Sequence, residues 1–388
     1  MSGDACGGRP VRARGPDRAA WHAEAGYRLI MPDGPAIGQG IGSGRLQRAG
    51  LAQAGATAAP AVPRQRRTIA LMNQKGGVGK TTTTVNLAAA FARAGRSTLL
   101  VDLDPQAHAT LHLGLDPGTL DSSVYDVLVD GAFDVKKAVR SVRENLAVLP
   151  SVTDLAGAEN ELAGAKDTQR RLERALAALG DAYEFVLIDC PPSLGLLTIN
   201  GLAAAREVII PMQAHFLALQ GVGKLLETVQ LVGQAINPRL AVTGVVLCMH
   251  DNSSTHTREV VADLEGFFAQ ARNTQTPWRT ARVLRPPIRR NIKLAECPSF
   301  GQTIFEYAPG ATSAEDYNAL AWGLLGEWDA MLARRTAEAA DPEAAAQPAP
   351  LTRRASPERA PRPPAAPEVV VPKAEPAPAA DVVAGASA

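Results

Sequence analysis

A glycine-rich loop between a short apolar run and a helical pattern constrains this chain more than any other feature. The apolar run is TIALMN, the loop is QKGGVGKT, and TTTVNLAAAFARAG follows with the composition of a helix. A strand, a glycine loop and a helix in this order place successive backbone N–H groups at a helix N-terminus, where they can surround phosphate oxygens. The usual pattern G-x-x-x-x-G-K-[ST] requires glycine at position 74, where this chain has Gln74 followed by Lys75.

Continuous apolar runs between helical stretches predict the fold class. The runs STLLVDLD, LAVLP, YEFVLIDC, EVIIP and AVTGVVLC suit strands of a parallel sheet that is buried on both faces. Segments such as TQRRLERALAALG supply helices between them. We therefore predict an α/β protein with a doubly wound, mostly parallel sheet, and the loop places it among the P-loop NTPases.

The last regular segment, SAEDYNALAWGLLGEWDAML, predicts an amphipathic helix. Its apolar residues form a stripe at helical spacing, made of Tyr317, Leu320, Leu324, Trp328 and Met331. A helix lying on a membrane surface is one interpretation. Packing against the core is the favoured one, because the polar face has no lysine cluster.

Composition divides the chain into three parts. Residues 1–67 hold ten arginines and four acidic residues without a sustained period, which predicts a disordered basic extension. Residues 68–335 form the predicted domain, and the Ala- and Pro-rich residues 336–388 predict a disordered tail. No apolar run reaches about 18 residues, so we expect no transmembrane helix. The four cysteines lack C-x-x-C spacing, which indicates reduced thiols in a cytoplasmic protein.

The loop residues have the chemistry of a nucleotide site. Glycines permit tight curvature and close approach of the backbone to a ligand. Lys80 can lie against the β- and γ-phosphates, and the hydroxyl of Thr81 can bind Mg²⁺. The predicted cofactor-binding residues of the loop are Gly76, Gly77, Val78, Gly79, Lys80, Thr81 and Thr82.

Acidic residues end two of the predicted strands. VDLDPQ places Asp102 and Asp104 after the second strand, at the edge where open α/β sheets bind ligands. One carboxylate can support a metal shell and the other can orient the attacking water, although a pair that caps the turn before Pro105 is the alternative. YEFVLIDC brings Asp189 to the end of another strand, in the layout of a Walker B acid.

Together these motifs resemble those of the ParA/Soj family of chromosome- and plasmid-partition ATPases, within the wider ParA/MinD group. The resemblance is carried by KGGVGKTTTTVNLA, a deviant Walker A box, and by LLVDLDPQA and FVLIDCPPSLGLLTINGL. IRRNIKLAECPSFGQTIFEY is similar to the C-terminal segment of the ParA branch, so the resemblance covers about 68–330. It implies ATP and Mg²⁺ as cofactors and an ATP-dependent homodimer.

The resemblance also implies individual roles. Lys75 matches the signature lysine, which reaches across the dimer to the phosphates of the partner's ATP, as an arginine finger does. Asp104 matches the residue needed for hydrolysis, and Asn291 matches a position that contacts adenine. The predicted catalytic residues are therefore Lys75, Lys80 and Asp104, and the predicted metal-binding residues are Thr81, Asp102 and Asp189.

The DNA contacts expected of the family transfer less directly. A family arginine implicated in DNA binding lies in MLDART, whereas this chain reads CMHDNSST with Ser253 at that position. Segment 279–293 holds six basic residues and no acid, within a domain of 25 basic and 28 acidic residues. This predicts nonspecific, salt-sensitive binding to DNA phosphates, with a solvated, ion-paired loop as the alternative. The predicted DNA-binding residues are Arg282, Arg285, Arg289, Arg290 and Lys293.

The function predicted from these features is that of a slow partition ATPase. Its ATP-bound dimer would bind nucleoid DNA without sequence preference, and a ParB-like partner would stimulate hydrolysis and release it. A related ATPase that positions a protein cargo without ParB is the alternative. A bacterial tyrosine kinase, which ends in a tyrosine cluster, is disfavoured because the last tyrosine here is Tyr317. A nitrogenase-type iron protein, which needs two cluster cysteines in each subunit, is disfavoured because the cysteines here lack that context.

Overall fold

The computed structural model describes residues 65–251 and 255–340. Most of the two expected tails, and Ser253, lie outside this part of the chain. Strand β1 (Arg67–Leu71) begins just before the predicted domain boundary, and helix α12 (Thr312–Ala340) continues beyond position 335. The domain boundary predicted at position 335 falls inside α12. The residues that follow it, TAEAA at 336–340, are compatible with a helix, and the first proline comes only after them. No helix in the described ranges has the length and apolar character needed to cross a bilayer.

Eight strands form one sheet in the order β3-β4-β2-β5-β1-β6-β7-β8. Every neighbouring pair is parallel except β3 and β4. The chain starts in the middle of the sheet and winds outward on both sides, which confirms the predicted doubly wound α/β fold. The remaining strands are β2 (Thr98–Asp102), β3 (Arg140–Arg143), β4 (Leu146–Leu149), β5 (Phe185–Asp189), β6 (Glu207–Met212), β7 (Ala241–Leu247) and β8 (Arg282–Leu284).

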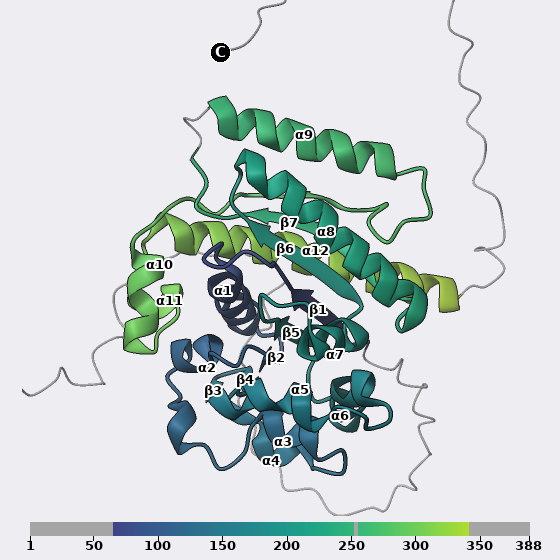
Figure 1. Ribbon diagram of the computed structural model, residues 1–388. Coiled ribbons are helices and arrows are strands. Elements are labelled where there is room, and N and C mark those ends of the chain that lie inside the picture. Colours follow the sequence, from purple (N-terminus) through teal and green to yellow (C-terminus); the bar gives the residue numbers. More distant parts are fainter. Residues whose placement is uncertain (1–64, 252–254, 341–388) are drawn as a thin grey trace, which may run out of the picture. The chain divides into compact units, whose positions relative to one another are not determined.

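Helices cover both faces of this sheet (Figure 1). One buried cluster joins the sheet to α1 and α12, and a second joins it to helices that include α3, α6, α7, α8 and α9. The helices besides α12 are α1 (Lys80–Arg93), α2 (His108–His112), α3 (Val124–Val129), α4 (Val135–Ala138), α5 (Ala158–Glu161), α6 (Arg171–Ala178), α7 (Leu196–Ala204), α8 (Phe216–Ala235), α9 (Thr255–Ala271), α10 (Lys293–Glu296) and α11 (Ile304–Tyr307).

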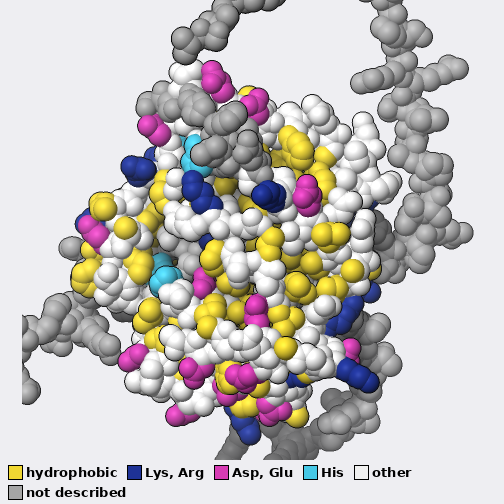
Figure 2. Space-filling model, viewed as in Figure 1, with side chains coloured by type: hydrophobic (Ala, Val, Ile, Leu, Met, Phe, Trp, Pro, Cys, Tyr) yellow, Lys and Arg dark blue, Asp and Glu magenta, His cyan; other side chains and the backbone are white. Residues whose placement is uncertain are grey.

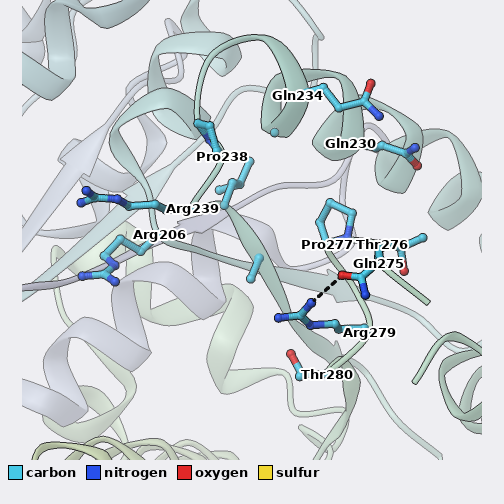
Figure 3. Close-up of a pocket in the computed structure, with 13 residues that line it drawn as sticks. Arg206, Gln230, Gln234, Pro238, Arg239, Gln275, Thr276, Pro277, Arg279 and Thr280 are labelled. Carbon is cyan, nitrogen blue, oxygen red and sulfur yellow. Dashed lines mark hydrogen bonds between the residues drawn. The ribbon is translucent and has the colours of Figure 1, made fainter. Parts of the chain in front are cut away.

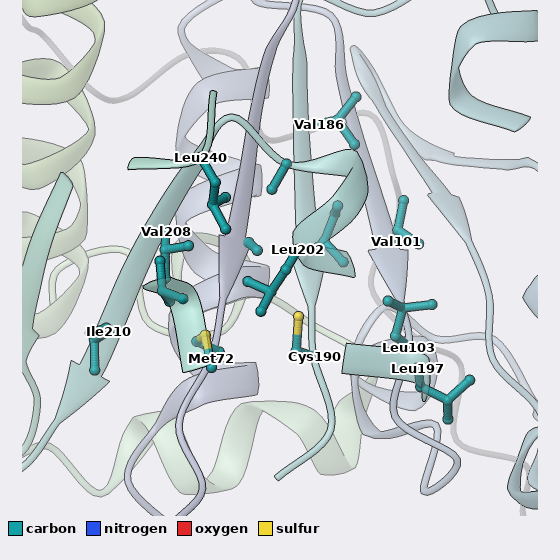
Figure 4. Close-up of a cluster of buried hydrophobic side chains, with 14 of the residues drawn as sticks. Met72, Val101, Leu103, Val186, Cys190, Leu197, Leu202, Val208, Ile210 and Leu240 are labelled. Carbon is teal, nitrogen blue, oxygen red and sulfur yellow. The ribbon is translucent and has the colours of Figure 1, made fainter. Parts of the chain in front are cut away.

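The two covered faces explain why the strands are apolar throughout. In β2, Leu99 and Val101 point into one cluster and Leu100 into the other. Figure 4 shows Val101 together with Leu202 of α7, in the cluster that also contains residues of α3, α6, α8 and α9. Helix α7 approaches the strands closely, since a Cβ on Gly201 would lie 2.9 Å from Sγ of Cys190.

The apolar stripe of α12 is buried, which confirms the core-packing interpretation. Tyr317, Leu320, Leu324 and Trp328 belong to the cluster that contains α1, and Met331 is partly buried against it. Arg67 closes the end of this cluster. Its guanidinium donates to the backbone oxygen of Leu324 at 2.6 Å and lies 5.6 Å from the ring centroid of Trp328.

The strand register brings the loop and the acidic motifs to one edge of the sheet. Leu71, which ends β1, pairs with Asp189 of β5, and Asp102 of β2 pairs with Asp189 from the other side. All three strands are parallel, so the segments that follow them leave the sheet side by side. Residues from β1, β2 and β5 therefore meet although 118 positions separate Leu71 from Asp189.

Candidate nucleotide-binding site

The glycine loop runs from the end of β1 into the first turn of α1. Gly77 and Gly79 have φ angles of 73° and 92°, a region that favours glycine. A Cβ on Gly79 would also lie 3.3 Å from Cβ of Cys248. The backbone N–H of Thr83 donates to the oxygen of Gly79 at 2.9 Å, so the helical hydrogen bonding starts directly at the loop.

Asn73 anchors the loop, a role that the sequence analysis missed. Its side chain donates to the backbone oxygen of Pro211 in β6 at 2.7 Å and accepts from the backbone N–H of Lys75 at 2.9 Å. The loop is thereby tied to the neighbouring strand. A polar residue at the end of the apolar run TIALMN was the available signal.

Lys80 and Asp189 form the centre of the site. The Nζ atom of Lys80 lies 2.9 Å from Oδ1 of Asp189 and 3.7 Å from Oδ2 of Asp104. Asp189 is fully buried and also accepts hydrogen bonds from Thr81 Oγ1 at 2.7 Å and from Thr84 Oγ1 at 2.9 Å. Burial disfavours the charge of Lys80, but the Asp189 carboxylate outweighs it and raises the pKa of this lysine.

Thr81 and Asp189 fit a Mg²⁺ site of the expected kind. In the described residues no group of three His, Cys, Asp or Glu side chains could hold a metal ion alone. Mg²⁺ prefers waters and substrate phosphates, with one or two protein oxygens. The hydroxyl of Thr81, next to the loop and 2.7 Å from the carboxylate of Asp189, provides such a minimal set.

Asp102 has a different environment from Asp189. Its fully buried carboxylate accepts from the backbone N–H of Asp104 at 3.1 Å and from the N–H and Oγ1 of Thr110 at 2.9 and 2.8 Å. Burial, with the charge of Asp189 added, raises the pKa of Asp102 to about 7. The observed contacts hold the segment after β2, and metal binding by Asp102 stays a prediction. The sequence analysis missed Thr110.

Asp104 lies between this segment and the loop lysine. Its Oδ1 accepts from the backbone N–H of Gln106 at 3.1 Å, and its Oδ2 lies 3.7 Å from Lys80 Nζ. Its backbone oxygen accepts from Ser151 Oγ at 2.8 Å, which fixes the turn. Asp104 is 7% exposed, so a small part of its surface is accessible at the site, while its backbone is held in place.

An apolar cavity of about 430 Å³ adjoins the loop. Asn291 lines it together with Gly79 and Thr82, and the adenine contact of Asn291 stays a prediction. Asn291 accepts from the backbone N–H of Lys293 at 3.0 Å, and its Nδ2 lies 3.5 Å from Oγ1 of Thr312. Apolar side chains make up most of the rest of the wall, among them Met249, Ile288, Ile292 and Leu294.

Lys75 lies on the other side of the loop and is exposed. Its Nζ donates to Nε2 of His215 at 2.8 Å. The two residues line a cavity of about 360 Å³, to which Lys224 also contributes. Lys75 makes no ion pair with an acid among the described residues.

The basic segment 279–293 differs from the sequence expectation. Acids from α9, α10 and α12 pair with four of its five predicted DNA-binding residues, which leaves Arg290 without an ion pair in the described chain. On the face shown in Figure 2, Lys and Arg side chains are scattered among acids and form no continuous basic surface. The structure therefore shows the ion-paired arrangement that was the alternative from the sequence, and DNA binding by these residues stays a prediction. The pairs are Arg282–Glu327, Arg285–Glu265, Arg289–Asp316 and Lys293–Glu296.

The fold and the loop define a P-loop NTPase with a deviant Walker A box. The family described as an AAA domain matches residues 66–242. The sporulation initiation inhibitor protein Soj of Bacillus subtilis (strain 168) is 44% identical over 255 residues, which cover 65% of this chain and 96% of Soj. The chromosome partitioning protein ParA of Myxococcus xanthus is 40% identical, over 67% of this chain and 88% of that protein. This chain belongs to the ParA/Soj family of partition ATPases.

Solved structures agree with the fold. A Mycobacterium smegmatis protein named cobyrinic acid a,c-diamide synthase, with bound ADP and magnesium, is 39% identical, covers 68% of this chain and 96% of its own, and has a TM-score of 0.57. The septum site-determining protein MinD of Pyrococcus horikoshii OT3 is 24% identical, covers 67% of this chain and 96% of its own, and has a TM-score of 0.52. The MinD likeness concerns the fold alone.

Proposed function

We propose that this partition ATPase hydrolyses ATP slowly with Mg²⁺, dimerises when ATP is bound, and binds DNA without sequence preference until a ParB-like partner stimulates hydrolysis. One observation carries the nucleotide part of the proposal. The buried Asp189 carboxylate holds Lys80 and Thr81 directly behind the glycine loop. These are the cation and the hydroxyl that a triphosphate and its metal require.

When bound, ATP and Mg²⁺ supply the phosphoryl group and the metal charge that hydrolysis needs. Lys80 neutralises phosphate oxygens, and Asp189 keeps its ammonium group oriented. Thr81 offers its hydroxyl to the metal. Asp104 orients the attacking water, and its fixed backbone limits the geometries that it can adopt.

The adenine would occupy the cavity beside the loop. Its apolar wall suits a planar base, and the amide of Asn291 supplies a polar contact at the rim. Lys75 lies outside this cavity, next to His215. From there it can turn toward a second subunit. Such a contact makes dimerisation depend on ATP, so that hydrolysis of the ATP ends the dimeric state.

Protein-cargo positioning is the second candidate, and DNA binding discriminates between the two. We would measure binding of the full chain to a labelled duplex of arbitrary sequence with ATP, ADP or no nucleotide across a salt series. ATP-dependent binding that weakens steeply with salt supports the DNA-partition proposal. Absence of binding in every state, in a preparation that hydrolyses ATP, would contradict it and favour a DNA-independent cargo. Association with the nucleoid in cells would follow from the first result.

A further inference from the structure

An arginine-lined cavity of about 740 Å³ lies at the opposite edge of the sheet from the nucleotide site (Figure 3). Arg206, Arg239 and Arg279 line it. The glycine loop follows the carboxyl end of β1, whereas Arg206 directly precedes β6, which runs parallel to β1. The cavity is therefore separate from the residues that the proposed function assigns to ATP.

The parallel strands bring the three arginines to one row. Arg206 precedes β6, Arg239 precedes β7, and Arg279 precedes β8, and these strands are neighbours in that order. The backbone N–H of Ala241 donates to the oxygen of Arg206 at 3.0 Å, and that of Val242 donates to Pro277 at 2.9 Å. The starts of the three strands are thus held together by backbone hydrogen bonds.

These arginines are exposed, and none of them forms a direct ion pair with an acid of the described chain, although the charge of Arg206 acts on the neighbouring Glu207. Arg279 donates to the side-chain oxygen of Gln275 at 3.2 Å, a neutral contact. No acid lines the cavity. The nearby carboxylate of Glu207 is occupied by Arg67 at 2.8 Å and by Thr243 Oγ1 at 2.6 Å. The charges of the row are therefore compensated less directly than those of the four ion-paired residues Arg282, Arg285, Arg289 and Lys293.

The other polar groups of the cavity suit phosphate oxygens. Gln230, Gln234 and Thr280 add neutral side chains that can donate hydrogen bonds, and Figure 3 shows the two glutamines along one helix, across the pocket from Arg206 and Arg239. Guanidinium groups bind phosphate with two parallel hydrogen bonds. Adjacent strands lie about 4.8 Å apart, so three of them carry the arginines over roughly 10 Å. Such a row suits the repeated phosphates of a duplex better than one small anion.

We propose that Arg206, Arg239 and Arg279 form the pocket that binds the phosphate backbone of duplex DNA. This inference rests on the proposed DNA-partition function and assigns its DNA contact to the amino edge of β6, β7 and β8. It also moves the contact away from all five residues that the sequence analysis selected. The lining combines guanidinium and amide groups, so we expect contacts to phosphates, which carry no base sequence.

The test compares two triple variants with the same change in charge. The pocket variant is R206A/R239A/R279A, and the control is R170A/R174A/R334A, which removes three exposed arginines that do not line the cavity. Binding of a labelled duplex is measured with ATP across a salt series. We expect the pocket variant to bind roughly ten-fold or more weakly, with a salt slope lower by about 0.9 for each phosphate that is no longer neutralised. The control should remain within about three-fold of the wild type.

Further measurements keep the result interpretable. ATP hydrolysis and thermal unfolding verify that the pocket variant is folded. A second variant, with lysine at the same three positions, keeps the charge and should retain most of the binding, since phosphates also accept point charges. Inorganic phosphate is titrated against the DNA complex with ATP saturating. Displacement at concentrations far below those that screen charge would identify a small-anion site and overturn the DNA assignment.

The outcomes separate this inference from the proposed function. If the pocket variant binds DNA as tightly as the wild-type protein, the assignment of the pocket is overturned and the proposed function stands. Equal losses in both triple variants would show an effect of net charge and would also overturn the pocket. If the wild-type protein does not bind DNA in any nucleotide state, the DNA function and the pocket both fail.

Discussion

The ammonium group of Lys75 lies 2.8 Å from Nε2 of His215 in the same subunit. His215 directly precedes α8, at the end of the segment that follows β6, and the loop that carries Lys75 is tied to β6 through Asn73. A lysine ammonium can only donate, so the ring nitrogen must accept. If Lys75 is to reach the phosphates of a partner subunit, this contact has to break first.

Replacement of Lys75 by Ala should separate nucleotide binding from dimerisation. Lys75→Ala leaves Lys80, Thr81 and Asp189 in place, so we expect the monomer to bind ATP normally and to lose the ATP-dependent dimer. Fluorescent-nucleotide titration and analytical ultracentrifugation measure the two properties. Lys224→Ala, which removes a lysine from the same cavity, is the control. A Lys75→Ala protein that dimerises with ATP as the wild type does would exclude the proposed role in the partner site.

His215→Ala should make the ATP-dependent dimer form more readily. Without the acceptor His215, Lys75 no longer has to break a hydrogen bond when the dimer forms. At an exposed position such a hydrogen bond contributes about 1 kcal/mol or less. We therefore expect the protein concentration for half-dimerisation to fall by up to about five-fold at saturating ATP. An increase in that concentration would mean that His215 supports the dimer instead.

Lys80→Ala should abolish productive ATP binding and also destabilise the protein without nucleotide. The mutation leaves the fully buried Asp189 without its cation, at a cost of about 3 kcal/mol in the free energy of unfolding. Urea denaturation with and without ATP measures both effects. Adding Asp189→Asn should recover part of the stability and none of the ATP binding. Unaltered stability of the single variant would show that the ion pair adds nothing to folding.

Asp104→Ala should stop hydrolysis while ATP binding continues. Its carboxylate touches Lys80 at 3.7 Å rather than at hydrogen-bonding distance, so Lys80 keeps its contact with Asp189. We expect the hydrolysis rate to fall by about 100-fold or more, with the dimer accumulating. Asp102→Asn is a useful comparison, because it removes the charge of an acid that holds the same segment. Normal turnover in Asp104→Ala would assign water activation elsewhere.

Protonation of His112 should weaken the fold in acid. His112 lies buried with its Nε2 atom 3.5 Å from Sγ of Cys297. Burial, helped by the charge of Arg143, lowers its pKa to about 4. The unfolded chain takes up this proton near pH 6.5, so stability is complete above about pH 6.5 and falls by up to about 3 kcal/mol towards pH 4. Urea denaturation of wild type and His112→Gln should show a smaller acid loss in the variant, and parallel losses would contradict this assignment.

The sequence alone determined those features that depend on neighbouring residues. The order of strand, glycine loop and helix around Gly79 determined the loop at the start of α1, and the apolar runs determined a sheet covered on both faces. The acids at the ends of the second strand and of YEFVLIDC were predictable because parallel strands present their carboxyl ends at one edge. The buried stripe of α12 followed from helical spacing.

Only the tertiary structure decided which charges are neutralised and which remain. Arg282 and Arg285 looked unpaired in a segment without acids, yet Glu327 of α12 and Glu265 of α9 reach them. The row of Arg206, Arg239 and Arg279 was invisible in the sequence because its members are spread over 74 residues. Sheet neighbours are far apart along the chain, so the sign of a surface depends on strand order and on which helix covers which edge. A local sequence window contains neither.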